Sequence, residues 1–309
     1  MGGWKRCKRW LGRRKLLVAT LAACGVLFGV SASFSGCMSF QMKEAEVREF
    51  FDSRGQEAPT FFRHRDALGE IFGAWSGTGE RPTVVFVHGS PGSWDNFAHM
   101  LANEALTRRY TLVAVDRPGF GRSLPRGPEP SIQTQAKRTH DAVVASGAPL
   151  PAVWLGHSLG GPVVARIAID FPESVSGLIL IAPSIDPELE QRRWYNWLAK
   201  FPLIKWGLSR EWRNSNEEIF PLKRELTALA EELGRIQSPT IVLHGDQDSL
   251  VPPANAEFVQ RRFVSAPVEL RLLEGVDHFI PWSDPEEMIR AMDALTQASA
   301  AGGTDAAAR

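Results

Sequence analysis

The chain has 309 residues, 44% of them hydrophobic and 23% charged, which excludes a wholly disordered protein. Its formal net charge is zero, but the seven basic residues before residue 38 have no acidic counterpart, which leaves 28 basic and 35 acidic residues in the remainder. This acidic remainder lacks the basic footprint of a nucleic-acid-binding protein, so we expect no nucleic-acid partner.

The first 37 residues predict an export signal or a membrane anchor. Residues 1–15 are basic, and residues 16–34 (LLVATLAACGVLFGVSASF) carry no charge, a combination typical of export signals. These 19 uncharged residues are also just long enough to span a bilayer, so an uncleaved anchor remains an alternative. In both cases the basic residues keep the N-terminus in the cytoplasm while the remainder crosses the membrane.

The cysteines favour lipidation over an uncleaved anchor. FSGC (34–37) resembles the cleavage box of bacterial lipoproteins, in which small residues precede a cysteine that becomes lipidated, although Phe34 stands where leucine is commonest. LAAC (21–24) offers Cys24 as a second candidate, but the apolar run before it is short and GVLFGV would follow the lipidated residue. We therefore predict lipid on Cys37 and an exported protein tethered to a membrane of the bacterial cell envelope.

After residue 38, apolar runs alternate with helical stretches. Residues 41–51 predict a helix or tether, and residues 59–76 predict two short strands around a turn at Ala67–Gly69. Six further predicted strands are TVVFVHG (83–89), TLVAVD (111–116), AVWLG (152–156), LILIA (178–182), TIVLHG (240–245) and VELRLLEG (268–275). Predicted helices are 96–106, 135–146, 161–171, 254–263 and 286–298. This alternation predicts one α/β domain over residues 38–309 with a mostly parallel, doubly wound sheet.

Two segments depart from the alternation. Residues 183–237 contain no obvious strand, carry a helical stretch at 221–235, and predict an insertion on the carboxyl edge of the sheet. Trp194 and Trp197 in this insertion are candidate substrate-binding residues, because large aromatic side chains can line an apolar pocket. The alternatives are that they pack the insertion onto the domain or that they touch lipid. The last residues, 299–309, are of low complexity and predict a disordered tail.

Residues 156–160 read GHSLG, which matches the pattern G-x-S-x-G after a predicted strand and before a predicted helix. The turn in this motif is so tight that the flanking positions can hardly carry a Cβ atom, and the serine hydroxyl stands above the sheet edge. Serine is a weak nucleophile alone, so Ser158 needs a base, and the base needs an acid that orients it.

Both partners follow strands later in the chain, in the order serine, acid, histidine that this motif requires. HGDQD (244–248) offers two aspartates, and VDHF (276–279) offers His278 as the base. Upstream, HGSPG (88–92) predicts a loop whose Ser90 N–H pairs with the N–H of Leu159 as an oxyanion hole.

Together HGSPGSWDNF, DRPGFGRS (116–123), GHSLGG, HGDQDSLVP and GVDHF resemble the α/β-hydrolase family of the fold-1 esterase type. The resemblance implies that residues 183–237 form a helical cap between the sixth and seventh strands. It also implies that the acid is the last residue of a G-x-x-D stretch, here GDQD, which favours Asp248 over Asp246. A serine nucleophile excludes the dehalogenase and epoxide hydrolase branches, which use aspartate.

The sequence thus predicts a serine hydrolase that cleaves an acyl ester through an acyl-enzyme, with Ser158, Asp248 and His278 as the triad. The substrate is expected to be a small molecule with a small or medium apolar acyl group. We expect no cofactor, and the histidine and acid spacings indicate no metal site. Amidase or peptidase, thioesterase, C–C hydrolase and perhydrolase activities remain alternatives, as does a hydrolase-fold protein that only binds.

Overall fold

The computed structural model describes residues 41–79 and 82–306. The predicted signal segment 1–37, with its candidate lipidation site Cys37, lies outside the described residues. Within the described residues, no helix has both the length and the apolar character needed to cross a bilayer.

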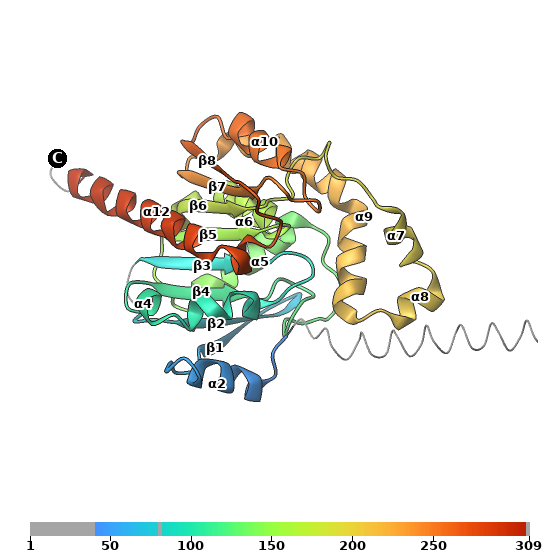
Figure 1. The fold of residues 1–309 in the computed structure, drawn as a ribbon, viewed down its shortest axis with the longest axis horizontal. Coiled ribbons are helices and arrows are strands. Elements are labelled where there is room, and N and C mark those ends of the chain that lie inside the picture. Colours follow the sequence, from blue (N-terminus) through green and yellow to red (C-terminus); the bar gives the residue numbers. More distant parts are fainter. Residues whose placement is uncertain (1–40, 80–81, 307–309) are drawn as a thin grey trace, which may run out of the picture. The chain divides into compact units, whose positions relative to one another are not determined.

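An eight-stranded sheet organises the chain in the order β1-β2-β4-β3-β5-β6-β7-β8 (Figure 1). The strands are β1 (Thr60–Asp66), β2 (Gly69–Ser76), β3 (Thr83–Val87), β4 (Thr111–Val115), β5 (Ala152–His157), β6 (Val175–Ile181), β7 (Thr240–Gly245) and β8 (Val268–Leu273). β2 pairs antiparallel with β1 and β4, whereas all neighbours from β4 to β8 are parallel. The predicted mostly parallel, doubly wound sheet is confirmed.

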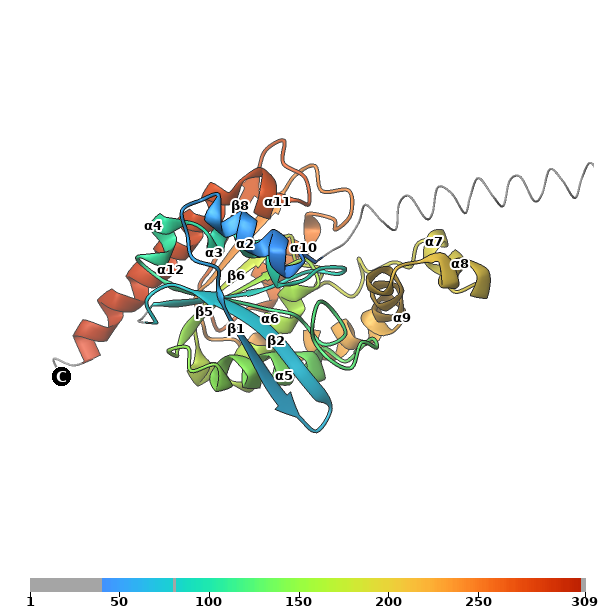
Figure 2. The ribbon, with the colours of Figure 1, turned by 90° about the horizontal axis from the view of Figure 1, so that it is seen from below.

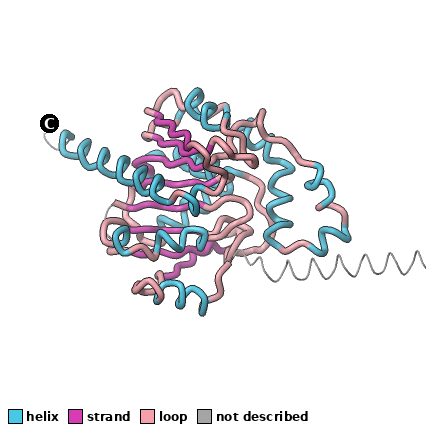
Figure 3. Tube along the Cα trace, in the orientation of Figure 1, coloured by secondary structure: helices cyan, strands magenta, loops and turns pink. Residues whose placement is uncertain are grey.

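Helices cover both faces of this sheet (Figure 2). The helices of the same compact unit are α2 (Glu44–Asp52), α3 (Ala98–Leu101), α4 (Glu104–Thr107), α5 (Ile132–Ala145), α6 (Gly160–Asp170), α9 (Arg210–Ala230), α10 (Ala254–Arg262), α11 (Ile280–Ser283) and α12 (Pro285–Ala306), of which α9 packs against α6. Short 3-10 turns are η1 (Trp94–Phe97), η2 (Pro172–Ser174) and η3 (Leu233–Arg235). In Figure 3 the strands lie side by side at the centre with the helices around them.

Two hydrophobic cores lie on opposite faces of the sheet because successive strand side chains point to opposite faces. On β3, Val85 and Val87 pack into the core formed with α5, α6, α9 and α10. Val84 and Phe86 pack into the other core, formed with α2, η1, α3 and α12. Burial on both faces explains why the central strands are continuous apolar runs.

Helices α7 (Trp194–Leu198) and α8 (Pro202–Gly207) belong to a different compact unit from the one formed by Phe40–Arg193 and Arg210–Arg309. The two helices have five and six residues, and α8 begins at Pro202, whose missing N–H is tolerated in a first helical turn. α7, α8 and α9 all lie in the chain between β6 and β7, where the cap was predicted.

Two helical predictions differ from the structure. The single helix predicted over 96–106 is divided into η1, α3 and α4, because Asn103 stops α3 and its side-chain oxygen accepts the Leu106 N–H at 3.3 Å as the N-cap of α4. The last helix continues to Ala306, through residues that the sequence placed in the disordered tail. The run ASAA (298–301) favours this continuation because alanine has the highest helix propensity.

Candidate active site

Ser158 lies in the turn between β5 and α6, with a backbone φ of +54°. This left-handed conformation is unusual for a residue with a side chain and persists only where the surroundings enforce it. The Ser158 N–H donates to the Ile181 carbonyl at 2.8 Å, and the Ser158 carbonyl accepts the Gly161 N–H at 2.9 Å. The turn is therefore fixed from both sides, by β6 and by the first turn of α6.

The glycines around Ser158 are required by close backbone approach. A Cβ atom on Gly156 would lie 2.4 Å from the Gly160 carbonyl oxygen, and one on Gly160 would lie 2.3 Å from the Val87 carbonyl oxygen. Both distances are shorter than any van der Waals contact, so no larger residue fits without moving a strand. The G-x-S-x-G pattern therefore reflects the packing of β3, β5 and α6.

Asp248 and His278 come together at the carboxyl edge of the sheet. Asp248 follows β7 and His278 follows β8, and because these strands are adjacent and parallel, their loops meet. His278 Nδ1 lies 2.7 Å from Asp248 Oδ2. The other oxygen, Oδ1, accepts the backbone N–H groups of Leu250 and Val251 at 2.9 and 2.8 Å.

The carboxyl of Asp248 is held in its charged form. Burial alone would raise the pKa of Asp248, but hydrogen bonds to His244 and His278 outweigh it and hold this pKa well below its usual range. His244 Nε2 lies 3.3 Å from the same Oδ2 atom that contacts His278. An ionised carboxylate in this position can orient the His278 ring with its Nδ1 protonated.

Asp246, the alternative acid, lies in a different environment. Its Oδ1 accepts the Gly275 N–H at 2.7 Å, which links the loops after β7 and β8. Asp246 is only partly buried, and the recorded hydrogen bond of its side chain goes to this backbone group. Its hydrogen bond therefore holds these two loops together.

His157, the residue between Gly156 and Ser158 in GHSLG, contacts the backbone of His278. Its Nε2 lies 3.1 Å from the His278 carbonyl oxygen, and the two rings contact each other at a tilt of 42°, with 4.9 Å between centroids. Burial, together with the nearby His278, lowers the pKa of His157 to about 3, so the ring is neutral at physiological pH. Its Nε2–H then donates to the carbonyl and fixes the backbone of His278, the predicted base. Sequence reasoning missed this role, because any residue type can occupy that position of the motif.

The predicted oxyanion loop lies directly beside Ser158. A Cβ atom on Gly89 would lie 2.9 Å from the Ser158 Cβ, so this glycine lets the loop after β3 approach the serine. The hydroxyl of Ser90 donates to Glu218 Oε2 at 2.8 Å. Leu159 stands at the N-cap position of α6 and is 4% exposed.

A buried ion pair that sequence analysis did not predict supports this loop. Arg117, fully buried, donates through Nε to the His88 carbonyl at 3.0 Å and through a terminal nitrogen to the Gly89 carbonyl at 2.9 Å. Its guanidinium also contacts Glu218 on α9 at 3.1 Å. Burial raises the pKa of Glu218, and the charge and hydrogen bonds of Arg117 oppose that rise. The loop, the DRPGFGRS turn and α9 are therefore joined by one network.

The first residue of DRPGFGRS organises that turn. The carboxylate of Asp116 accepts the Trp94 and Arg122 backbone N–H groups, each at 2.7 Å. Burial raises the pKa of Asp116 to about 7. Gly121 has a φ of +52°, and a Cβ atom there would lie 2.1 Å from the Asp116 carboxylate. This geometry agrees with a structural turn.

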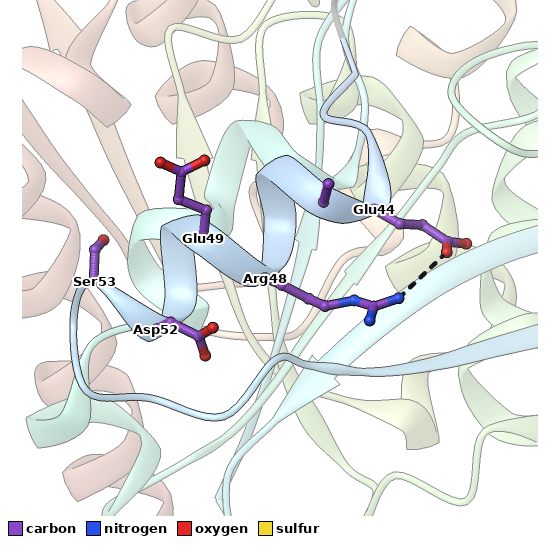
Figure 4. Close-up of a pocket in the computed structure, with 6 residues that line it drawn as sticks. Glu44, Arg48, Glu49, Asp52 and Ser53 are labelled. Carbon is purple, nitrogen blue, oxygen red and sulfur yellow. Dashed lines mark ion pairs between the residues drawn. The ribbon is translucent and has the colours of Figure 1, made fainter.

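Trp194 and Trp197, the candidate substrate-binding residues, lie on α7 in the separate unit and are 73% and 53% exposed. No group of three histidine, cysteine or acidic residues that could hold a metal occurs within residues 41–79 and 82–306. An open hollow follows the outer side of α2, where Arg48 pairs with Glu44 at 3.8 Å (Figure 4). None of the residues named as catalytic lines that hollow.

Residues 84–291 match the family model described as alpha/beta hydrolase family. The chain is 25% identical to pimeloyl-[acyl-carrier protein] methyl ester esterase of Nitrosomonas europaea, over 71% of this chain and 97% of that one. It is 24% identical to the dihydrolipoyllysine-residue acetyltransferase component of the acetoin cleaving system of Cupriavidus necator, over 77% of this chain and 73% of that one.

Among solved structures, a putative lipase of Acinetobacter baumannii superposes with a TM-score of 0.64 and 21% identity. The superposition covers 86% of this chain and 98% of the lipase. At this identity, the likeness shows a shared fold.

Proposed function

Because this chain belongs to the alpha/beta hydrolase family, we propose that it is a serine hydrolase of carboxylic esters with Ser158 as its nucleophile. One observation carries the proposal: a serine held at φ +54° between a strand and a helix, at the sheet edge where His278 Nδ1 lies 2.7 Å from the Asp248 carboxylate. This is the arrangement of a strained nucleophile, a base and an orienting acid.

In the proposed reaction, the Ser158 Oγ attacks the acyl carbonyl while His278 Nε2 takes the hydroxyl proton. The tetrahedral intermediate collapses, the ester C–O bond breaks, and His278 returns the proton to the departing alcohol. Water then attacks the acyl-enzyme, His278 takes a proton from it, and the acid leaves as the proton returns to Ser158. Asp248 stays ionised throughout and stabilises the imidazolium.

The backbone N–H groups of Ser90 and Leu159 are proposed to receive the negative charge of the tetrahedral oxygen. The support is placement: Gly89 brings the first loop against Ser158, and Leu159 directly follows the nucleophile. Such preformed donors are worth about 2.7–4 kcal/mol each in related chemistry. The Arg117–Glu218 pair holds the Ser90 loop and therefore positions one of the two donors.

We propose an ester of a small or medium apolar acid as the substrate class. One relative in the family is named an esterase of a methyl ester, which agrees with ester chemistry in this family. Amidase or peptidase, thioesterase, C–C hydrolase and perhydrolase reactions would use the same nucleophile and remain the alternatives.

The test is hydrolysis of p-nitrophenyl esters of graded acyl length by the wild type and by Ser158→Ala. The glycines that form the turn remain in Ser158→Ala, so the variant should fold and lose turnover. Turnover of an ester by the variant near the wild-type rate would refute the acyl-enzyme mechanism. A folded wild type that binds acyl compounds and hydrolyses none of the esters, thioesters or amides would favour a binding protein. The predicted role of Trp194 and Trp197 in substrate binding stays a prediction, which the acyl-length profiles of their alanine variants would check.

We also propose that residues 1–37 export the protein and tether it to a membrane through lipid on Cys37. The support is the basic stretch, the uncharged run after it and the FSGC box. In the native host, Cys37→Ala should abolish incorporation of labelled fatty acid and leave a precursor of unprocessed mass. Unchanged lipid labelling would assign the modification to another residue, and an unprocessed wild type would indicate an uncleaved anchor.

A further inference from the structure

The segment 191–210, which contains α7 and α8, exposes an unusual amount of apolar surface. Of the 18 large hydrophobic side chains that are exposed in the described chain, 8 lie between residues 194 and 206. They include Leu203 at 78%, Trp194 at 73% and Trp206 at 68% exposed, and α8 buries none of its residues. Single exposed apolar residues are ordinary on a protein surface, whereas a dense group of them marks a surface that binds something.

The charge of the same segment has one sign. It contains five basic residues and no acidic residue, namely Arg192, Arg193, Lys200, Lys205 and Arg210. The chain after residue 38 has the opposite balance, with 28 basic and 35 acidic residues. The segment is thus cationic and aromatic, whereas the chain after residue 38 as a whole is acidic.

We propose that segment 191–210 docks onto the surface of a bilayer that contains anionic phospholipid. Tryptophan and tyrosine rings are enriched at the level of lipid headgroups, and basic residues bind anionic lipid surfaces. α7 has five residues, and α8, which begins at Pro202, has six. Both are too short to span a bilayer, which requires about 20 residues. The segment therefore lies in the interface plane, with its apolar side chains among the acyl chains and its cations at the phosphates.

Charge argues against a second copy of the chain as the occupant. Two such segments would bring ten positive charges and no negative charge together, and like charges at an interface oppose association. Arg210 already pairs with Glu211 at 2.6 Å, so an anionic lipid surface offers an opposite charge to the remaining basic residues of the segment and an apolar layer to the aromatic ones. The proposal does not depend on the chemistry at Ser158.

The test is hydrogen–deuterium exchange, followed by mass spectrometry, on the full chain in vesicles of phosphatidylcholine alone or with phosphatidylglycerol added. Any tether provided by residues 1–37 is present in both vesicles, so the difference between them isolates the anionic lipid. We expect amides within 191–210 to exchange at least about tenfold more slowly in the anionic vesicles, because each basic residue near such a surface contributes about fivefold to binding and these contributions multiply.

The variant K200E/K205E should lose this difference, whereas K137E/R261E, which reverses two exposed cations on α5 and α10, should keep it. Unchanged exchange elsewhere in the chain verifies that both variants fold. The proposal is overturned if the amides of 191–210 exchange equally in both vesicles, or if K200E/K205E keeps full protection. Protection that depends on protein concentration and not on phosphatidylglycerol would also overturn it, and would assign the surface to contact between copies.

Discussion

Replacing Asp248 by asparagine separates the proposed acid of the triad from its neighbour Asp246. The Asp248 Oδ1 accepts two backbone N–H groups, from Leu250 and Val251, and only an oxygen can fill that position. An asparagine must therefore place its NH₂ group where Oδ2 now lies, 2.7 Å from His278 Nδ1. Two donors would then face each other, so His278 changes to the tautomer that carries its proton on Nε2.

A His278 ring protonated on Nε2 cannot take the Ser158 proton. The loss of kcat expected from such a wrong tautomer is on the order of 10⁴. The assay is steady-state hydrolysis of the best p-nitrophenyl ester at pH 7, with circular dichroism to verify the fold. Asp246→Asn is the matched control, because its carboxylate accepts only a loop N–H, and it should lose stability more than kcat. A larger loss of kcat in Asp246→Asn than in Asp248→Asn would refute the assignment.

The same variant should change the pH dependence of stability in a defined direction. The folded pKa of Asp248 is lowered, so the ionised carboxylate stabilises the fold above its unfolded pKa of about 3.9. That contribution disappears as the pH falls toward the folded pKa. The difference in unfolding free energy between wild type and Asp248→Asn, measured in urea, should therefore shrink below about pH 4. A difference that stays constant from pH 7 to acid would show that the carboxylate charge does not contribute.

Three further changes test the surroundings of Ser158. Glu218→Gln breaks a buried ion pair and should lower the free energy of unfolding by about 3–5 kcal/mol in urea titrations, whereas the exposed Glu231→Gln should change it little. Gly89→Ala places a Cβ atom 2.9 Å from the Ser158 Cβ and should lower kcat by about 10²-fold, because it displaces the oxyanion loop. A Gly89→Ala variant with the kcat of the wild type would show that the loop accommodates the methyl group. The folded pKa of Asp116 is raised to about 7, so the folded state binds an extra proton and the free energy of unfolding falls from about pH 4 to 7. In calorimetry, Asp116→Asn should lack this part of the pH dependence. An unchanged pH dependence would assign it to other groups.

The sequence predicted the parts of the site that depend on local pattern. Apolar runs located six strands, and GHSLG located the turn, because both features need only neighbouring residues. The meeting of the His278 and Asp248 loops followed from the rule that the carboxyl ends of adjacent parallel strands lie at one edge.

Contacts between distant segments could not be predicted. Arg117 and Glu218 are 101 positions apart, and their pairing depends on where α9 packs, which no local pattern encodes. The contact of His157 with the His278 carbonyl spans 121 positions and arises only once β5 and the loop after β8 are in place. The available signal for the first contact was an arginine directly after an apolar strand, in a glycine-rich turn, since a charge that becomes buried there needs a partner.

The most direct test of Ser158 as the nucleophile is labelling of the folded full chain with a fluorophosphonate, read by intact mass and peptide mapping. We expect the wild type to gain one adduct, located on Ser158, and to lose ester hydrolysis in proportion to labelling. Ser158→Ala should gain none. A folded wild type that hydrolyses esters while Ser158 stays unlabelled, or a Ser158→Ala variant that labels equally, would contradict the assignment of Ser158.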